Sequence, residues 1–365
     1  MKAGIVGLPN VGKSTLFNCL SSAKAQSANF PFCTIDPQIG QVSVPDERLT
    51  KLAEIVHPGR IVPAVCDIVD IAGLVKGASK GEGLGNQFLA NIRECDAIIH
   101  VLRCFDDPNI VHVDGSVNPV RDKEIIDLEL QFKDLDTLEQ RLKKVEKVAR
   151  VGGDKAAKIE LGVIEAYKEA LLQGRSARTV QFETEEEIAA AKGLFLLTTK
   201  PVLYVCNVDD ASAATGNEFT EAVRKAIEGE NAGMIIISAQ TEADIAELDT
   251  YEEKQMFLND LGLDESGCNR MIKAIYHLLT LQTFITAGEM EVKAWTFRRG
   301  WKAPQCAGVI HTDFERGFIR AEVINYLTLI ECGSLAAARE KGKVRSEGKD
   351  YVMQDGDVVL FRFNV

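Results

Sequence analysis

The sequence predicts an α/β protein: a doubly wound sheet with an inserted helical hairpin and a small C-terminal mixed β domain. Three observations predict this architecture. Short apolar strands alternate with helical segments, one interval is helical throughout, and the segment after residue 280 returns to short alternating strands. A chain of 365 residues is long enough for two or three such parts, each with its own core.

Five short runs of apolar and β-branched residues are typical of the buried strands of a parallel sheet. Helical stretches such as 14–23 and 85–94 lie between several of them. This alternation predicts a doubly wound sheet that binds its ligand at the carboxyl ends of its strands. The five runs are residues 2–6, 65–71, 97–102, 202–206 and 234–238.

Residues 121–195 interrupt the alternation. Leu135, Leu138 and Leu142 recur at spacings of three and four, and a second such series follows Gly152-Gly153. We expect an antiparallel helical hairpin whose first helix has roughly 28 residues and projects about 42 Å. The hairpin would separate the two parts of the sheet domain, which we place at residues 1–120 and 196–279.

The tip of this hairpin is rich in positive charge. Its surface is either a solvated helix face with intrahelical ion pairs or a contact for RNA or the ribosome. The basic residues are Arg141, Lys143, Lys144, Lys147, Arg150, Lys155 and Lys158, and only Glu146 and Asp154 oppose them.

Residues 280–365 form a separate compositional unit. Lys and Arg number 12 against 11 Asp and Glu after residue 280, compared with 30 against 43 before it. Alternating short runs predict strands around 295–297, 308–310 and 358–363, so a small mixed β domain is expected here.

The composition excludes several classes of protein. A net charge of −12 argues against coating of nucleic acid by bulk electrostatics, and no apolar run reaches the roughly 18 residues of a membrane span. The nine cysteines are scattered singly, which indicates buried apolar residues instead of disulfides or a zinc site. Because the first strand begins almost at Met1, we expect no signal peptide and a cytoplasmic protein.

The segment Gly7-Leu8-Pro9-Asn10-Val11-Gly12-Lys13-Ser14 follows the first strand and opens a helix, as a P-loop must. Its glycines let backbone N–H groups face the phosphates. Lys13 is expected to reach the β- and γ-phosphates as a catalytic group, and the Ser14 hydroxyl to ligate Mg²⁺. The chain is therefore predicted to be a P-loop NTPase. The predicted phosphate contacts come from Asn10, Val11, Gly12, Lys13, Ser14 and Thr15.

Two further segments match the switch regions of such a site. Asp70, at the end of the second apolar run, is expected to hold Mg²⁺, and the N–H of Gly73 to contact the γ-phosphate. Thr34 lies between the P-loop and Asp70, where a switch threonine would close on Mg²⁺. Leu74, the residue after Gly73, stands where Ras-like enzymes carry the glutamine that orients the attacking water. Another group must therefore align water, or hydrolysis is very slow.

The loops after the fourth and fifth strands are predicted to contact the base. Asn207, Val208 and Asp210 stand where GTPases carry Asn-Lys-x-Asp, and Ser238-Ala239 where they carry Ser-Ala-Lys. Val208 replaces the lysine that packs over guanine, which weakens guanine specificity. Asp210, in contrast, is the residue that a guanine reader would use.

Together these motifs resemble the YchF/Obg-like ATPase family across essentially the whole chain, with a C-terminal segment similar to a TGS domain. The resemblance implies preference for ATP over GTP, slow hydrolysis and association with the ribosome or a ribosomal subunit. Contacts to tRNA or rRNA would involve the hairpin tip and the TGS-like domain. His112 matches the family's mobile-loop histidine, a catalytic candidate in place of the missing glutamine. Asn10 matches an asparagine that coordinates K⁺ in potassium-activated relatives, and the family usually has Glu where this chain has Asp210.

Three functions remain open from the sequence. The first is an ATPase switch in which His112 positions water. The second is a GTPase that assists ribosome assembly, distinguished by tighter binding of GTP. The third is a ribosome-binding module whose nucleotide sets its conformation and whose turnover is incidental.

Overall fold

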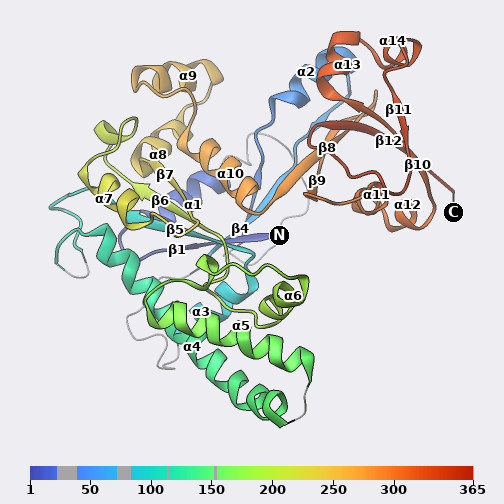
Figure 1. Cartoon of the computed structure of the whole chain (residues 1–365). Helices are drawn as coiled ribbons and strands as arrows, with labels where there is room; N and C mark the ends of the chain where they lie inside the picture. The colour runs from blue at the N-terminus through green and yellow to red at the C-terminus, as the bar shows by residue number, and fades with distance from the viewer. Residues whose placement is uncertain (23–38, 72–83, 113–114, 152–153, 365) are drawn as a thin grey trace. The chain divides into compact units, whose positions relative to one another are not determined.

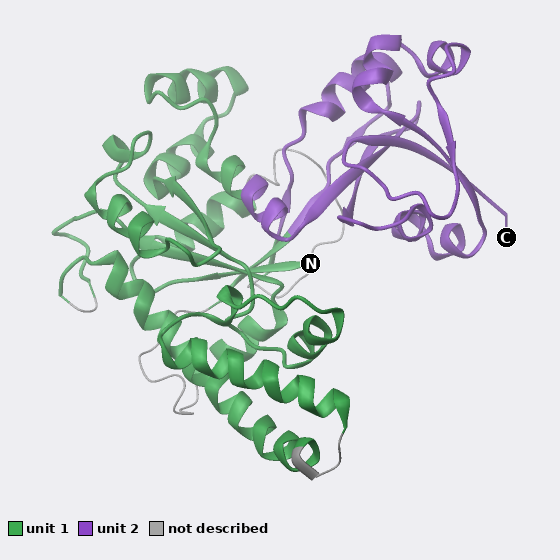
Figure 2. Cartoon of the chain, viewed as in Figure 1, with its two compact units in different colours: residues 1–40, 67–271 green, residues 41–66, 272–365 purple. Residues whose placement is uncertain are grey.

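The computed structural model describes residues 1–22, 39–71, 84–112, 115–151 and 154–364. The chain divides into two compact units (Figure 2). The first unit contains residues 1–40 and 67–271, and the second contains residues 41–66 and 272–365. The linear order of the chain therefore differs from the spatial grouping, because an early segment belongs to the same unit as the C-terminus.

The first unit is built on the doubly wound sheet that the sequence predicts. The strand order is β2-β4-β1-β5-β6-β7, and the pairs β1–β4, β1–β5, β5–β6 and β6–β7 are parallel (Figure 1). All five predicted runs are confirmed as strands. Every residue of β5 and β6 is buried, which explains their continuous apolar character. The strands are β1 (Lys2–Val6), β2 (Ile39–Ser43), β4 (Val65–Asp70), β5 (Ala97–Arg103), β6 (Val202–Asn207) and β7 (Gly233–Ile237). The division between the units falls within β2, after residue 40, and within β4, after residue 66.

Helices connect these strands, and the connections bring the predicted site loops to the carboxyl ends of the strands. The helix α10 runs from the first unit into the second. The helices are α1 (Lys13–Ser22), α3 (Leu84–Glu94), α4 (Pro119–Val151), α5 (Lys155–Leu172), α6 (Glu185–Gly193), α7 (Glu218–Ala226), α8 (Ala239–Glu247), α9 (Tyr251–Asp260) and α10 (Gly267–Leu278), with short 3₁₀ turns at Ala177–Thr179 and Asp210–Ser212.

The predicted hairpin is formed by α4 and α5, which Figure 1 shows as a long pair in green. Leu138, Val145 and Tyr167 belong to its apolar core. The first helix has 33 residues, more than the roughly 28 expected, because it begins at Pro119. Proline is favoured at the first helical position, and the preceding Asn118 accepts a hydrogen bond from the Arg121 N–H, as a helix cap does.

Buried polar contacts hold the hairpin to the rest of the first unit. The Asp134 carboxylate accepts the N–H groups of Leu197 and Thr198 at 2.7 and 2.8 Å. At the base of α4, Lys123 bonds the Glu230 carboxylate, which also pairs with Arg178 at 2.9 Å. Since buried ions are costly unless paired, these contacts fix the base of the hairpin more strongly than exposed pairs would.

The second unit is a mixed sheet with the strand order β11-β10-β12-β8-β9-β3. Its aromatic core includes Phe284, Phe297 and Phe361. The strands are β3 (Ile61–Val62), β8 (Leu281–Ala287), β9 (Val292–Arg298), β10 (Phe318–Asn325), β11 (Arg345–Glu347) and β12 (Asp357–Phe363), and the helices are α2 (Glu47–Val56), α11 (Ala303–Ile310), α12 (Thr312–Arg316), α13 (Tyr326–Cys332) and α14 (Leu335–Glu340).

Residues 41–66 belong to the second unit through contacts that no pattern in the sequence predicts. Strand β3 pairs in parallel with β9, and Arg48 of α2 donates to Asp355 at 2.8 Å. The spatial division thus falls at residue 272, and it assigns 41–66 to the same unit as the C-terminal domain.

One predicted strand is wrong. Residues 308–310 are the end of helix α11, although strands at 295–297 and 358–363 are confirmed. Pro304 in the first turn and Gln305, whose side chain accepts the Lys302 N–H, mark the start of a helix. The short run Gly-Val-Ile was too brief for its periodicity to distinguish a strand from a helix end.

The cysteines agree with the composition. Of the eight described, seven are buried and all are free thiols, and Cys332 alone is partly exposed. Within the described part of the chain, no helix combines the length and the apolar character that a membrane span needs.

Candidate functional site

The predicted P-loop occupies the turn between β1 and α1 in the first unit. Asn10 has φ of 63° and Gly12 has φ of 91°, so two residues adopt the left-handed conformation within one short turn. The Gly12 carbonyl accepts the first helical N–H, from Leu16, at 3.0 Å. The turn therefore delivers the N-terminus of α1, with Lys13 and Ser14, to the carboxyl edge of the sheet.

Gly12 is required for a steric reason as well. A Cβ atom on Gly12 would lie 2.2 Å from Nδ2 of Asn207. Gly7 is also crowded, since its Cβ would lie 2.9 Å from the Val101 carbonyl oxygen. The two glycines of the motif thus allow the loop to approach β5 and the end of β6 closely.

Asn207 joins the P-loop to the predicted base-reading loop. Its Nδ2 donates to the Val11 carbonyl at 2.9 Å, and its Oδ1 accepts the Ala239 N–H at 2.8 Å. The side chain is buried and both of its polar atoms are bonded. Asn207 therefore fixes the spacing between the phosphate-binding turn and the start of α8, which places it in the site by positioning other groups.

The groups predicted to hold Mg²⁺ and the phosphates meet at the ends of β1 and β4. The Lys13 ammonium contacts the Asp70 carboxylate, and Ser14 is exposed at the N-terminus of α1. Mg²⁺ prefers hard oxygen ligands and usually retains waters, so one hydroxyl and one carboxylate are a suitable protein contribution. The donors present therefore fit the ion. Thr34 and Gly73 lie outside the described residues.

The loop after β5 is organised by Arg103. Its guanidinium is fully buried and donates to the carbonyl oxygens of Phe105, Asp107 and Ile110 at 3.0–3.2 Å. The guanidinium also lies over the Phe105 ring, 4.7 Å from its centroid. Three backbone acceptors on one planar group set the path of this loop toward His112.

The end of this loop is attached both to the P-loop and to the hairpin. Nδ2 of Asn10 donates to the Val111 carbonyl at 3.1 Å. His112 is buried, and its Nε2 lies 2.8 Å from Oδ2 of Asp122 in the first turn of α4. Asp122 in turn pairs with Arg121. His112 is thus held inward in this structure, so alignment of a water molecule by His112 would require release from Asp122.

His100 is a second histidine on β5, and its chemistry differs. Its side chain is buried beside Tyr204, and burial lowers the pKa of His100 to about 3. Its Nε2 has no hydrogen-bond partner among the residues that the structure describes. The imidazole therefore stays neutral at physiological pH and belongs to the core behind the hairpin base.

Asp210 is held in position by two hydroxyl groups. Ser238 Oγ and Thr241 Oγ1 each donate to its Oδ1 at 2.6 Å. Partial burial opposes ionisation, but the hydrogen bonds from Ser238 and Thr241 outweigh it and lower the pKa of Asp210. The carboxylate is exposed and charged, which suits it to accept a hydrogen bond from a base. Val208, in contrast, is buried.

The structure thus brings together most of the predicted site residues and adds three that sequence reasoning missed. Arg103 had a local signal, since a charged residue ends an otherwise apolar strand. Thr241 follows the predicted Ser238-Ala239 motif by one turn. Asp122 had no signal, because its partner His112 is ten residues away across a loop.

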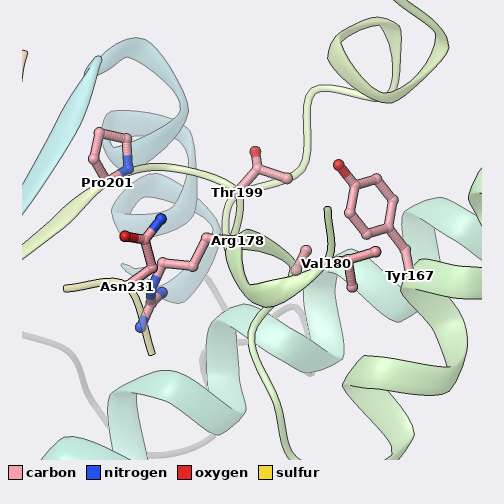
Figure 3. A pocket seen from close by; sticks show the side chains of 7 residues that line it. Tyr167, Arg178, Val180, Thr199, Pro201 and Asn231 are labelled. Atoms are coloured by element: carbon pink, nitrogen blue, oxygen red, sulfur yellow. The ribbon is translucent and has the colours of Figure 1, made fainter. Parts of the chain in front are cut away.

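A cavity of about 250 Å³ lies beside the hairpin base, apart from these residues. In Figure 3, Arg178 and Asn231 lie on one side of it and Tyr167 on the other. Arg178 is already bonded to Glu230 and to the Tyr204 hydroxyl, so its charge is compensated within the protein. The cavity is lined by Tyr167, Ala177, Arg178, Val180, Thr199, Pro201 and Asn231.

Known proteins are similar to this chain over its whole length, and two family models match separate parts of it. The family model described as "50S ribosome-binding GTPase" matches residues 2–147, and the YchF GTPase C-terminal model, described as a protein of unknown function, matches residues 281–364. "Ribosome-binding ATPase YchF" of Bacillus subtilis (strain 168) is 56% identical over 367 residues, covering 100% of both chains. The protein of the same name from Escherichia coli O157:H7 is 53% identical, covering 100% of this chain and 99% of its own.

More distant relatives agree. "Obg-like ATPase 1" of Gallus gallus is 44% identical, covering 100% of this chain and 92% of its own. The solved structure of the Schizosaccharomyces pombe YchF GTPase superposes with a TM-score of 0.90 at 39% identity, covering 99% of this chain and 97% of its own.

Replacing Gly12 with alanine is expected to weaken nucleotide binding. The Kd should rise at least about a hundredfold, or roughly 2.7 kcal/mol. The new Cβ would collide with Asn207 and would have to adopt a positive φ, so the P-loop could not keep its shape. Titration with a fluorescent ATP analogue measures the effect. Gly162→Ala is the control: beyond its chain neighbours and the backbone of its own helix α5, no described atom lies within 4 Å of its Cβ position, so binding should be unchanged. Normal binding by Gly12→Ala would contradict the steric account.

Proposed function

The chain belongs to the YchF/Obg-like ATPase family, and on that basis we propose that it is a cytoplasmic, ribosome-associated switch that binds ATP with Mg²⁺ and hydrolyses it slowly to ADP and phosphate. The observation that carries the proposal is the contact of Lys13 with Asp70 at the end of a P-loop, which puts the phosphate-binding cation beside a Mg²⁺ ligand. The names of the bacterial relatives support ATP and the ribosome as the nucleotide and partner.

Each group has a defined role in this proposal. Backbone N–H groups of the P-loop and the Lys13 ammonium neutralise the phosphates. Ser14 and Asp70, with Thr34, would hold Mg²⁺, which supplies positive charge where the transferred phosphoryl group gains negative charge. With leucine at position 74, no glutamine orients water, so the slow step is attributed to the placement of His112.

K⁺ is a second candidate ion. Asn10 has one side-chain oxygen that could ligate a monovalent cation, because its Nδ2 is occupied by the Val111 carbonyl. A cation bound there would therefore sit directly beside the loop that carries His112.

The guanine alternative rests on one observation. Asp210 is ionised and oriented by Ser238 and Thr241, and such a carboxylate can accept donors from guanine. The buried Val208 favours the ATP reading, since it offers no cover for a guanine ring.

The hairpin tip is the first proposed surface for the ribosome. Arg141 is bonded to Glu160 and Lys155 to Glu186, so these two charges are compensated. Lys143, Lys144, Lys147 and Lys158 are exposed and have no carboxylate partner among the described residues. Unpaired lysines near the end of a long projecting hairpin suit contact with phosphate groups of RNA.

His112→Ala is expected to bind ATP normally and to lose turnover by about a hundredfold, the usual contribution of a positioned acid–base group. Asp122→Asn should raise turnover about fivefold, because it replaces a charge-assisted hydrogen bond with a neutral one and weakens the hold on His112 by about 1 kcal/mol. Single-turnover ATP hydrolysis measures both.

The double variant distinguishes these roles. If Asp122 acts through His112, adding Asp122→Asn to His112→Ala changes nothing further. Unchanged or reduced turnover in Asp122→Asn alone would contradict release from Asp122 as a limiting step, and full activity of His112→Ala would remove His112 from the mechanism.

Charge reversal at the hairpin tip, Lys143→Glu with Lys147→Glu, should weaken co-sedimentation with bacterial 70S ribosomes by about tenfold near 0.1 M salt. Turnover without ribosomes should stay the same, since these residues are far along α4 from Asp122. Lys192→Glu with Lys225→Glu, two exposed lysines on α6 and α7, is the matched control and should bind as the wild type does. Equal loss in both double variants would show that only net charge matters.

A further inference from the structure

Three polar side chains line the cavity beside the hairpin base and leave hydrogen-bonding groups without a partner among the described residues. Tyr167 belongs to α5, Arg178 to the short turn Ala177–Thr179, and Asn231 to the segment before β7 (Figure 3). We call these three residues the polar lining. They lie within the first unit, but none of them is among the residues predicted to hold the nucleotide. The cavity is therefore a separate feature of the same unit.

The Arg178 guanidinium is buried but only partly bonded. Only 6% of its side chain is exposed. Its Nε donates to the Glu230 carbonyl at 3.2 Å, and its Nη2 donates to the Glu230 carboxylate at 2.9 Å and to the Tyr204 hydroxyl at 3.2 Å. Its Nη1, with two N–H groups, has no acceptor among the described residues. Because buried donors are almost always bonded, an acceptor from outside the chain is expected at this nitrogen.

Tyr167 and Asn231 add two more hydrogen-bonding groups. The Tyr167 side chain is buried, and its hydroxyl has no partner in the described part of the chain. Burial, together with the nearby Asp134, raises the pKa of Tyr167 to about 12, so the phenol keeps its proton at neutral pH. The Asp134 carboxylate itself accepts the N–H groups of Leu197 and Thr198. Asn231 is exposed where it lines the cavity, and its amide likewise has no partner within the described residues.

The chemistry of the polar lining defines what it can bind. Nη1 of Arg178 can only donate, and the Tyr167 hydroxyl and the Asn231 amide can each donate as well. A ligand that uses all three groups must therefore present acceptor oxygens. A carboxylate offers about four lone-pair positions on two oxygens, and its hydrogen bond with a guanidinium is charge-assisted. The polar lining thus favours a carboxylate.

The charges behind the polar lining favour one negative charge on the ligand over two. Arg178 shares Glu230 with Lys123, and Lys123 also pairs with Asp127. The charges of these two cations and two anions sum to zero. A dianion such as hydrogen phosphate would therefore meet no excess positive charge, whereas the single charge of a carboxylate is met by the charge-assisted hydrogen bond from Arg178.

The volume of the cavity and its remaining walls define the body of the ligand. The cavity measures about 250 Å³, and a cavity of about 150 Å³ can hold a benzene molecule. Ala177, Val180 and Pro201 contribute apolar surface. The space therefore suits a carboxylate whose body is about as large as a benzene ring. Ordered water alone would satisfy the donors, but it would leave these apolar walls hydrated.

We propose that this cavity binds a small monocarboxylate with an apolar body and thereby acts on the root of the hairpin. The carboxylate would share Arg178 with Glu230, whose other oxygen is bonded by Lys123. Lys123 follows Asp122, which holds His112. A ligand that draws Arg178 toward the cavity weakens one contact in this series, so the hold on His112 changes. This consequence rests on the proposed ATP hydrolysis, whereas binding itself does not.

Ligand-observed NMR on the full-length protein, with sodium benzoate as the probe, tests the binding. MgADP is present throughout, so that the predicted nucleotide site is occupied. Benzoate should bind with a Kd of about 1 mM, which is typical of so small a ligand. Benzamide, which has a similar shape and no charge, should bind at least about tenfold more weakly, and phosphate should not displace benzoate.

Two variants each remove one donor of the polar lining. Tyr167→Phe deletes only the hydroxyl and should weaken benzoate binding about tenfold. Asn231→Gly deletes the amide and keeps the left-handed backbone, since Asn231 has φ of 53°, and should weaken binding about fivefold. Tyr251→Phe is the matched control, because this exposed tyrosine of α9 does not line the cavity, and it should bind as the wild type does. Unchanged thermal midpoints verify that the variants fold.

The outcomes separate the site from its consequence. If the wild type does not bind benzoate, or if both cavity variants bind it as well as the wild type does, the proposal is overturned and benzoate is an adventitious additive only. Bound benzoate should change single-turnover ATP hydrolysis by at least about twofold in the wild type and much less in Tyr167→Phe. Unchanged hydrolysis with benzoate bound would overturn the action on the hairpin root. Absence of ATP hydrolysis without benzoate would contradict the proposed function and leave the binding result intact.

Discussion

The two hydrogen bonds of the Asn207 side chain are the constraint on which the nucleotide site depends. They connect the carbonyl of Val11, in the P-loop, with the N–H of Ala239, at the start of α8. Neither turn has a fixed position relative to the other through the sheet alone, because both are loops beyond strand ends. A buried amide with both polar atoms satisfied fixes that distance, and the closeness of Gly12 to Asn207 leaves no room for adjustment.

A continuous set of contacts leads from this site to the hairpin. Asn10 bonds the backbone at Val111, His112 bonds Asp122, and Asp122 belongs to the first turn of α4. One residue further along α4, Lys123 is bonded to Glu230. Because Val111 and His112 are adjacent, we expect displacement of the loop at Val111 to disturb the contact between His112 and Asp122 at the root of the hairpin. The N-terminal turn of α4 therefore lies between the P-loop and the hairpin whose tip is the proposed ribosome contact.

Much of this arrangement follows from local sequence. The strands of the first unit were predictable because residues buried on both faces are apolar throughout, and the P-loop because its glycines and lysine have fixed spacing. Contacts between distant segments were not predictable. The pairing of β3 with β9 depends on backbone groups that carry no residue signature, and the partnership of His112 with Asp122 depends on the path set by Arg103. The wrong strand at 308–310 has a similar cause, since three apolar residues fit a strand or a helix end equally well.

The preference for ATP or GTP depends on the loops that are predicted to contact the base. Val208 is buried and cannot cover a guanine ring, while Asp210 stays charged and oriented by Ser238 and Thr241. Calorimetric titration of nucleotide-free protein with non-hydrolysable ATP and GTP analogues in Mg²⁺ compares these two influences directly. The ATPase account predicts that the ATP analogue binds at least about tenfold more tightly, roughly 1.4 kcal/mol. Tighter binding of the GTP analogue would contradict it and would make Asp210 a guanine-reading residue in a GTPase.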